Sequence, residues 1–255
     1  MPRVTDLVFP RLERKEDRRK ERWHRDVMDE VFDRPTLLAV SRMVTSGHFK
    51  EVDFSISTGK EANVFRVSGA AGFRALKVYR ISNSIFRHLP PWALAEIHRE
   101  VGGASFQRMI FAWAHREFTS LKRCFEAGVP VPKPIAQFRN LLIMEFVGEE
   151  GLPSPVLIKS VVEDPTAVRS EVASASRTMV ERAELVHGDL SPFNVLYHRG
   201  HAVLIDVGQV LRTDHPQAKE MLRRDATNFA RYFTRMGLPT PPETLFTEMG
   251  GDLLP

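Results

Sequence analysis

The sequence predicts an α+β fold, with an antiparallel sheet in the first half of the chain and mostly helices in the second half. Three short apolar runs separated by turn residues lie between residues 52 and 79, a pattern typical of antiparallel strands. Apolar residues recur at helical spacing in residues 111–127, 166–184 and 223–236. At 255 residues, the chain has the length of one large domain or two small lobes.

Helices are expected before the sheet. Apolar residues at helical spacing mark a first helix through residues 23–31, and Asp33 begins a second helix that ends at Gly47. These elements are too short for a separate domain. We therefore expect two lobes, the first formed by residues 51–147 and the second by residues 148–255. Residues 1–50 are expected to pack on the first lobe.

The segment between the sheet and the next helix has no clean periodicity. Residues 80–110 contain Pro90-Pro91 and Gly102-Gly103, so we expect an irregular stretch that moves or changes conformation with a ligand. A helix over residues 111–127 follows. Residues 135–138 and 141–147 then predict a hairpin.

Composition predicts a soluble protein of the cell interior. Hydrophobic residues make up 43% and charged residues 27% of the chain, which is ordinary for a globular domain. No apolar run approaches the roughly 18 residues of a membrane span, and the first residues contain no signal-peptide core. The single cysteine, Cys124, cannot form an internal disulfide and is expected in the core. These features favour a reducing, cytoplasmic location.

The charge of the chain is concentrated near its start. The net charge is +4, and residues 11–25 alone hold eight Lys/Arg against four Asp/Glu. Such a basic segment on an otherwise balanced chain favours a polyanionic partner, of which RNA is the obvious candidate. A solvated helix face with internal salt bridges explains the same residues equally well.

The most informative segment is residues 185–196, LVHGDLSPFNVL, followed by an apolar strand that ends in Asp206. Phosphoryl transfer needs a carboxylate beside the attacking hydroxyl and metal ions that neutralise phosphate charge. Asp189 can supply the carboxylate, while Asn194 and Asp206 supply the hard oxygen ligands that Mg²⁺ prefers. This spacing is typical of protein-kinase-like phosphotransferases. A β-hairpin of any function, with a polar turn, is the alternative.

Lys77 is a second candidate, because it lies within the apolar strand 75–79. Buried lysines are rare unless they are paired. Glu117, in the middle of the helix over residues 111–127, is the best-placed partner. Glu96 and Glu100 are alternative partners. Without any functional role, Lys77 would be an exposed lysine on an edge strand.

Together these motifs resemble the RIO family of atypical protein kinases, specifically its type-1 branch in a minimal, archaeal-like form. The resemblance is carried by four segments. The first is residues 185–196, called the catalytic loop below, and the others are STGKEANVF at residues 57–65, IDVGQ at 205–209 and DHPQA at 214–218. The segment at residues 57–65 has one glycine, where ordinary kinases have a glycine-rich loop.

The resemblance implies a truncated bilobal protein-kinase-like fold, since only 49 residues follow Asp206. It implies a serine kinase and ATPase that uses ATP with Mg²⁺ or Mn²⁺, with Asp206 able to accept phosphate. Lys77 is expected to contact the nucleotide, as are Ser57, Lys60 and Glu61 in the phosphate-side loop. The main chain of Glu145 and Val147 is expected to meet the adenine. The family's role in maturation of the small ribosomal subunit implies pre-ribosomal RNA as a partner, and no membrane.

Two departures from the family pattern keep other functions open. The type-1 loop usually reads H-A-D where this chain has Gly188, and it usually has Glu where this chain has Pro192. Small-molecule kinases of the aminoglycoside/choline type have a similar loop but lack the segment at residues 57–65. A third possibility is an assembly factor in which ATP gates binding and turnover is incidental.

Overall fold

The computed structural model describes residues 31–81, 91–102 and 105–255. The chain divides into two compact units, which are described separately below. Unit 1 runs to Phe118 and includes Pro134–Phe146, while unit 2 comprises Thr119–Lys133 and Val147–Pro255. The lobe boundaries expected from the sequence stay predictions.

Unit 1 is built around a five-stranded antiparallel sheet with the strand order β1-β2-β3-β5-β4. The three strands and the hairpin expected from alternation are present, with small shifts at their ends. Their bounds are β1 (Glu51–Thr58), β2 (Ala62–Gly69), β3 (Gly72–Tyr79), β4 (Pro134–Phe138) and β5 (Leu141–Glu145).

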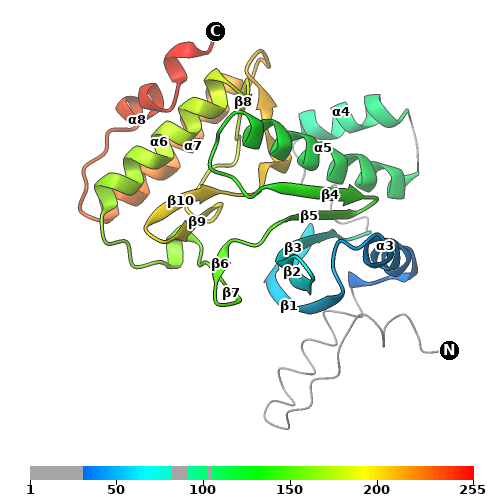
Figure 1. Cartoon of the computed structure of the whole chain (residues 1–255). Coiled ribbons are helices and arrows are strands. Elements are labelled where there is room, and N and C mark those ends of the chain that lie inside the picture. Colours follow the sequence, from blue (N-terminus) through cyan, green and yellow to red (C-terminus); the bar gives the residue numbers. More distant parts are fainter. Residues whose placement is uncertain (1–30, 82–90, 103–104) are drawn as a thin grey trace, which may run out of the picture. The chain divides into compact units, whose positions relative to one another are not determined.

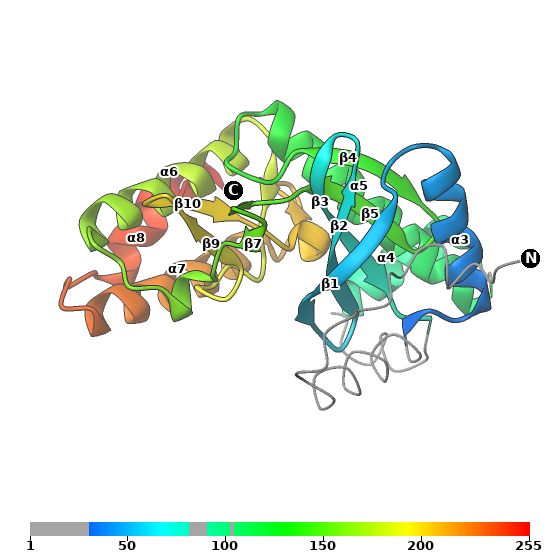
Figure 2. The ribbon, with the colours of Figure 1, turned by 60° about the horizontal axis from the view of Figure 1, so that its bottom comes forward.

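Helices cover both faces of this sheet (Figures 1 and 2). Helix α3 (Arg34–Thr45) begins at Asp33, whose side chain accepts the Thr36 backbone N–H at 2.9 Å. It packs on one face, while α4 (Pro91–Val101) and α5 (Phe106–Glu126) pack on the other. Because side chains alternate along a strand, Leu76 and Val78 of β3 join the α3 core, and Tyr79 joins the α4–α5 core.

Helix α4 corrects the expectation that residues 80–110 are irregular throughout. Ala93 and Ile97, spaced by one helical turn, are buried in the core that α4 shares with α5. The prolines and glycines predict irregularity, yet Pro91 begins the helix and Gly102 follows its end. Proline at a helix start and glycine after a helix end are ordinary helix boundaries. The expected mobility concerns in part residues 82–90 and 103–104, which lie outside the described residues.

Unit 2 consists of helices and four short strand pairings. The helices are α6 (Pro165–Glu181), α7 (Ala218–Arg235) and α8 (Pro242–Glu248), and α7 begins five residues before the expected residue 223. Strands β8 (Leu185–Val186) and β11 (Leu211–Arg212) pair, as do β9 (Val195–His198) and β10 (His201–Leu204), and β6 (Gly148–Glu149) and β7 (Leu152–Pro153). The fourth pairing is a single bridge between Val156 and Leu196. Single-turn helices occur at Leu157–Lys159, Val207–Gln209 and Gly251–Leu253.

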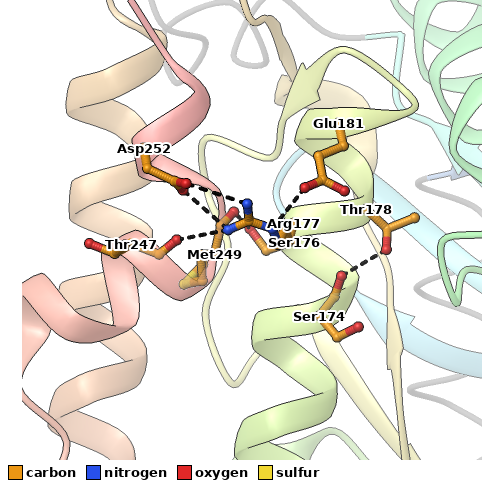
Figure 3. A network of polar contacts seen from close by, with 8 residues as sticks. All are labelled: Ser174, Ser176, Arg177, Thr178, Glu181, Thr247, Met249 and Asp252. Carbon is orange, nitrogen blue, oxygen red and sulfur yellow. Dashed lines mark hydrogen bonds and ion pairs between the residues drawn. The ribbon is translucent and has the colours of Figure 1, made fainter.

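Polar contacts tie α6 to the end of the chain (Figure 3). Arg177 donates to Glu181 at 2.7 Å, to Asp252 at 3.1 Å and to the Thr247 carbonyl at 3.3 Å. The buried Ser176 hydroxyl donates to the Met249 carbonyl at 3.2 Å. Helix α6 is thereby held against α8 and the last turn of the chain.

Two expectations from composition can be compared with the structure. Cys124 is fully buried, and burial raises the pKa of its thiol to about 12, so it is an unreactive core residue as expected. In the part of the chain that the structure describes, no helix is both long and apolar enough to span a bilayer.

Candidate active site

Lys77 and Glu117 form a buried ion pair in unit 1. Lys77 Nζ lies 2.8 Å from both Glu117 Oε1 and Glu117 Oε2, and both side chains are almost fully buried. Tyr79, two residues along β3 on the same face, donates its hydroxyl to Glu117 Oε2. The expected pairing of Lys77 with Glu117 is therefore present, and Glu96 pairs with Arg116 instead.

Neighbouring donors fix the shape of this site. The Lys77 ammonium also lies 5.2 Å from the centroid of the Tyr79 ring, within the range of a cation–π interaction. Glu117 thus accepts three hydrogen bonds from two residues of one strand. Such a charge-assisted arrangement holds the lysine in one position and leaves the carboxylate hydrogen-bonded.

The phosphate-side loop is the tight turn between β1 and β2. Ser57 lies near the end of β1, and Lys60 and Glu61 lie in the turn itself. Gly59 N donates to the Ala62 carbonyl at 3.0 Å, and a Cβ on Gly59 would lie 2.9 Å from that oxygen. Glycine at position 59 therefore permits the close approach of the Ala62 carbonyl. The Ser57 and Lys60 side chains are exposed. On the neighbouring strands, Val64 is opposite Lys77 in register.

The residues expected to meet adenine fall on either side of the division of the chain into units. Glu145 ends β5 in unit 1 and is exposed. Val147 is the first residue of the second segment of unit 2, and its carbonyl accepts the Ser154 N–H at 3.0 Å. Their contact with adenine stays a prediction.

Asp189 and Asn194 come together in unit 2. Asn194 Nδ2 donates to the Asp189 carbonyl at 2.8 Å and lies 3.3 Å from Asp189 Oδ2. Asn194 N donates to the Ser191 carbonyl at 2.8 Å, which closes the loop into a tight turn. The Asn194 carbonyl in turn accepts the Ile205 N–H at 3.0 Å. Ile205 is thus paired with Asn194, and Asp206 is the next residue along the chain.

Asp206 has an unusual backbone. Its φ of 63° is in the left-handed region, which few residues other than glycine adopt. It precedes the turn Val207–Gln209, but its side chain does not cap that turn. Backbone strain of this kind clusters at functional positions.

These oxygen atoms fit a magnesium ion. Mg²⁺ typically takes one or two carboxylates from the protein, with further oxygens from water and phosphate. Asn194 offers an amide oxygen and Asp206 a carboxylate, both hard ligands. Among residues 31–81, 91–102 and 105–255, no group of three or more His, Cys, Asp or Glu forms a self-sufficient metal site. A site completed by nucleotide phosphates matches this donor set.

Burial shifts the pKa values of Asp189 and of its neighbour His187 in opposite directions. Partial burial raises the pKa of the Asp189 carboxyl, and the nearby Asp206 adds to this, whereas His187, Arg224 and Asn194 oppose it. Burial lowers the pKa of His187, which stays neutral and donates Nε2–H to the Ile205 carbonyl at 3.1 Å. His187 thereby joins the catalytic loop to the segment after β10 that carries Asp206, which lies two residues beyond the end of the strand.

The sequence interpretation missed two residues of α7 that hold the catalytic loop. The buried Asp225 accepts the Gly188 and Leu190 N–H groups, each at 2.9 Å, on either side of Asp189. Arg224 donates to the Gly188 carbonyl at 2.5 Å. Burial raises the pKa of Asp225 well above its ordinary value, against the pull of the two N–H donors. The only available signal was an aspartate on the apolar side of a helical pattern.

A groove elsewhere in unit 2 is unrelated to these residues. It has a volume of about 630 Å³ and lies along α6 and β10, where Ser170, Glu171 and His201 line it. None of the candidate site residues lines it.

The fold and the two groups of residues define a protein-kinase-like protein. Its sheet presents a lysine paired with a helix glutamate, and its second unit presents an Asp189–Asn194 loop followed by Asp206. The chain belongs to the RIO family, because the family model described as the RIO domain matches residues 63–245.

Named relatives agree with this membership. The chain is 38% identical over 98% of its length to the RIO-type serine/threonine-protein kinase Rio1 of Haloferax volcanii, of which it covers 89%. It is 33% identical over 81% of its length to Rio1 of Methanocaldococcus jannaschii, of which it covers 71%. It is 35% identical over 91% of its length to human RIO1, but it spans only 43% of that protein. The chain is therefore a member of a family of serine/threonine protein kinases.

A solved structure has the same fold. The Chaetomium thermophilum Rio2 kinase, determined as an ADP/Mg²⁺-phosphoaspartate complex, matches 86% of this chain with a TM-score of 0.66. The chain covers 66% of that structure at 23% identity. This similarity confirms the expected kinase-like α+β fold.

Proposed function

We propose that this chain is an ATP- and magnesium-dependent serine/threonine protein kinase of the RIO type that also hydrolyses ATP. One observation carries the proposal. The Asn194 side chain donates to the Asp189 carbonyl, and the Asn194 carbonyl accepts the N–H of Ile205, the residue before Asp206. In this proposal a carboxylate for the hydroxyl and two hard metal ligands lie on one loop and on the segment that follows β10, as phosphoryl transfer requires.

In this proposal the residues of unit 1 bind the nucleotide. Lys77 contacts the phosphates, and Glu117 holds it in place from α5. Ser57, Lys60 and Glu61 contact the phosphates from the β1–β2 turn. The Glu145 carbonyl and the Val147 amide bind the adenine through the main chain, so the identity of their side chains matters little.

The residues of unit 2 hold the metal and orient the acceptor. Asn194 and Asp206 would bind Mg²⁺, or Mn²⁺ in its place. When bound, the metal supplies positive charge that neutralises the phosphates. Asp189 accepts a hydrogen bond from the substrate serine and takes its proton as the new ester bond forms.

Hydrolysis of ATP in this proposal uses Asp206 as a phosphate acceptor. A carboxylate oxygen of Asp206 forms a bond to the γ-phosphorus as the bond to ADP breaks, and water later releases inorganic phosphate. The phosphoaspartate of the Chaetomium thermophilum Rio2 complex motivates this step.

The biological setting is also part of the proposal. We infer that the protein acts in the cytoplasm on the maturing small ribosomal subunit and contacts its RNA. The basic residues 11–25 motivate the RNA contact and lie outside the described residues.

Separate substitutions of Asp189 and Asp206 test these roles. Asp189→Asn removes the proton acceptor, so kcat for phosphotransfer should fall on the order of 10²–10⁴-fold, the usual range for an acid–base group. The ATP dissociation constant should hardly change. Asp206→Asn removes a charged metal ligand and should weaken ATP binding in Mg²⁺ more than in EDTA. Isothermal titration with a non-hydrolysable ATP analogue, with steady-state kinetics, measures both effects.

Two further variants complete this experiment. Lys77→Ala should abolish turnover, since the phosphates lose the cation that Glu117 holds in place. Asp214→Asn is the matched control: Asp214 is an exposed aspartate paired with Arg212, eight residues beyond Asp206. Equal effects of Asp189→Asn and Asp206→Asn on binding and rate would refute their separate roles, and wild-type turnover in Lys77→Ala would refute the site.

A further inference from the structure

Phe193 is an exposed aromatic residue in the middle of the catalytic loop. Its side chain is 62% exposed, although Leu190 and Val195 in the same loop are fully buried. Single exposed apolar residues are common on protein surfaces. The position of this one, between Asp189 and Asn194, gives it significance.

The loop backbone is fixed on both sides of Phe193. The Pro192 carbonyl accepts the Ile158 N–H at 3.0 Å, and Asn194 is bonded through its N–H, side-chain amide and carbonyl. Asp225 fixes the beginning of the loop from α7. The exposure of Phe193 is therefore built into a rigid loop, which holds the ring in solvent four residues along the chain from Asp189.

We propose that Phe193 is a specificity-determining residue that contacts an apolar side chain close to the phosphorylated serine of a protein substrate. This inference rests on the proposed function. The serine hydroxyl must reach Asp189, and an extended chain advances only about 3.3 Å per residue. Residues two or three positions from the serine thus pass within reach of a ring four residues along the loop.

The charges around Phe193 favour a protein segment over nucleic acid. Single-stranded nucleic acids stack bases on aromatic residues, but within grooves that carry positive charge. Residues 187–198 contain no lysine or arginine. Arg224 bonds to the Gly188 carbonyl near the start of the loop, but the two carboxylates of Asp189 and Asp206 both reach the surface close to it. An apolar peptide side chain meets no such repulsion and gains by removing the ring from water.

Serine peptides that differ at one flanking position test this inference. For each position from three before to three after the serine, kcat/KM is compared between a leucine and a glycine peptide. The wild-type protein should prefer leucine at one position by about 10-fold, the usual scale for one apolar group in a pocket. Phe193→Ala should reduce that ratio to about 2-fold or less, whereas Phe193→Leu should retain most of it.

The ratio of two peptides is unaffected by any general loss of activity in a variant. Phe125→Ala is the matched control, because Phe125 is another exposed phenylalanine of unit 2, on α5 and outside the loop. It should keep the wild-type ratio. A wild-type protein without apolar preference at any position would overturn the inference, as would an unchanged ratio in Phe193→Ala.

Two other results have distinct meanings. If Phe193→Ala leaves the peptide ratio unchanged but weakens binding of single-stranded RNA, the ring stacks on bases and the inference is overturned. If the wild-type protein phosphorylates no peptide at all, the protein-kinase function proposed above has failed, and the inference fails with it.

Discussion

Tyr79 links the two charges of unit 1. Lys77 and Glu117 alone form an ion pair whose geometry depends on two flexible side chains. The Tyr79 hydroxyl adds a third donor to Glu117, from the same strand as Lys77 and on the same face. Because burying an ion pair is costly unless its remaining hydrogen-bonding capacity is satisfied, Tyr79 contributes to keeping the pair formed.

Tyr79→Phe should therefore weaken catalysis without disrupting the core. The ring and its packing remain, but Glu117 loses one charge-assisted hydrogen bond, a contribution of about 1.5–3 kcal/mol. We expect kcat/KM for ATP to fall on the order of 10-fold, since 1.4 kcal/mol corresponds to a factor of about 10. Steady-state ATP turnover measures this.

Tyr232→Phe is the control for loss of a tyrosine hydroxyl. Tyr232 donates to the Leu157 carbonyl at 3.2 Å, in unit 2 and apart from the ion pair. If both variants lower kcat/KM equally, or if neither does, Tyr79 has no particular role in positioning Glu117.

A buried neutral histidine makes stability depend on pH. The folded-state pKa of His187 is lowered by burial, whereas in the unfolded chain it is about 6.5. The stability that His187 contributes is thus fully present above about pH 6.5. It is lost as the pH falls toward the lower folded-state pKa, because only the unfolded chain then binds the proton.

His187→Gln should make unfolding less sensitive to acid. Glutamine keeps an N–H donor for the Ile205 carbonyl but does not titrate. Between pH 7 and pH 5 the free energy of unfolding should fall less steeply than in the wild-type protein, by up to about 1.4 kcal/mol per pH unit. Urea unfolding at several pH values measures the slope, with the exposed His201→Gln as control. Parallel curves for wild type and His187→Gln would contradict a buried neutral histidine.

At this scale the sequence predicted the charged residues better than the groups that hold them. Lys77 stood out as a charge in an apolar strand, and Glu117 as an acid in the middle of a helix. Tyr79 and Asp225 did not, because a tyrosine in a strand and an aspartate in a helix are ordinary. Their roles arise from contacts across 38 residues in one case and 35 to 37 in the other, which local patterns do not encode.

At the scale of elements, α7 and the β8–β11 pair hold the catalytic loop. Helix α7 contributes Asp225 and Arg224, which bond to the backbone around Asp189. Strand β11 contributes Leu211, which closes over Gly188. A Cβ on Gly188 would lie 2.7 Å from Leu211 Cδ1 and 3.1 Å from the Gln209 carbonyl. The glycine that departs from the usual H-A-D pattern therefore matches its local packing.

Gly188→Ala should destabilise this protein, although alanine is usual in the type-1 loop. The φ of Gly188 is +76°, which strains an alanine, and the new methyl group meets Leu211 and a carbonyl. We expect a loss of about 1–3 kcal/mol, the usual cost of overpacking. Chemical denaturation measures it, and phosphotransfer should fall because Asp189 is the next residue.

A double-mutant cycle separates the two causes. Leu211→Val shortens the side chain that meets the new methyl group, so Gly188→Ala should cost less in that background than in the wild type. The cost of the positive φ would remain. If Gly188→Ala is neutral in both backgrounds, neither the clash nor the backbone strain is real.

Elements were predictable from the sequence where periodicity was clean. Alternation predicts β1, β2, β3 and the β4–β5 hairpin, and helical spacing predicts α3, α6 and most of α5. Helix α5 begins at Phe106, five residues before the expected residue 111 and within the stretch expected to be irregular. Helix α4 is not apparent from the sequence, because its short apolar stripe lies between Pro90-Pro91 and Gly102-Gly103, and such pairs are as typical of loops as of helix ends. Helix α7 begins five residues before the predicted residue 223, because Ala218, Met221 and Leu222 already lie at helical spacing, and Ala218 and Leu222 are buried in the core.

At the scale of the whole molecule, charge rather than packing distinguishes the start of the chain. Residues 11–25 carry an excess of four positive charges, which equals the net charge of the chain. These residues lie outside the described ones. We propose that they contact phosphates of pre-ribosomal RNA. The alternative explanation is a solvated helix with internal salt bridges.

The salt dependence of RNA binding decides between these alternatives. Each neutralised phosphate contributes a slope of about −0.7 to −0.9 to log K against log salt. Three or four contacts therefore give a total of roughly −2 to −4. Replacing Arg14, Lys15, Arg18 and Arg19 together by glutamine should flatten this slope toward zero, as measured by fluorescence anisotropy with a small-subunit RNA fragment.

A matched variant controls for net charge. Lys50, Lys122, Lys133 and Lys159 are exposed lysines elsewhere in the chain, and their replacement by glutamine changes the net charge equally. If the contacts belong to residues 11–25, this second variant keeps most of the wild-type slope, because counterion release counts phosphates that are touched rather than total charge. Equal flattening by both variants would show a nonspecific effect of net charge. An unchanged slope in the first variant would favour the solvated helix.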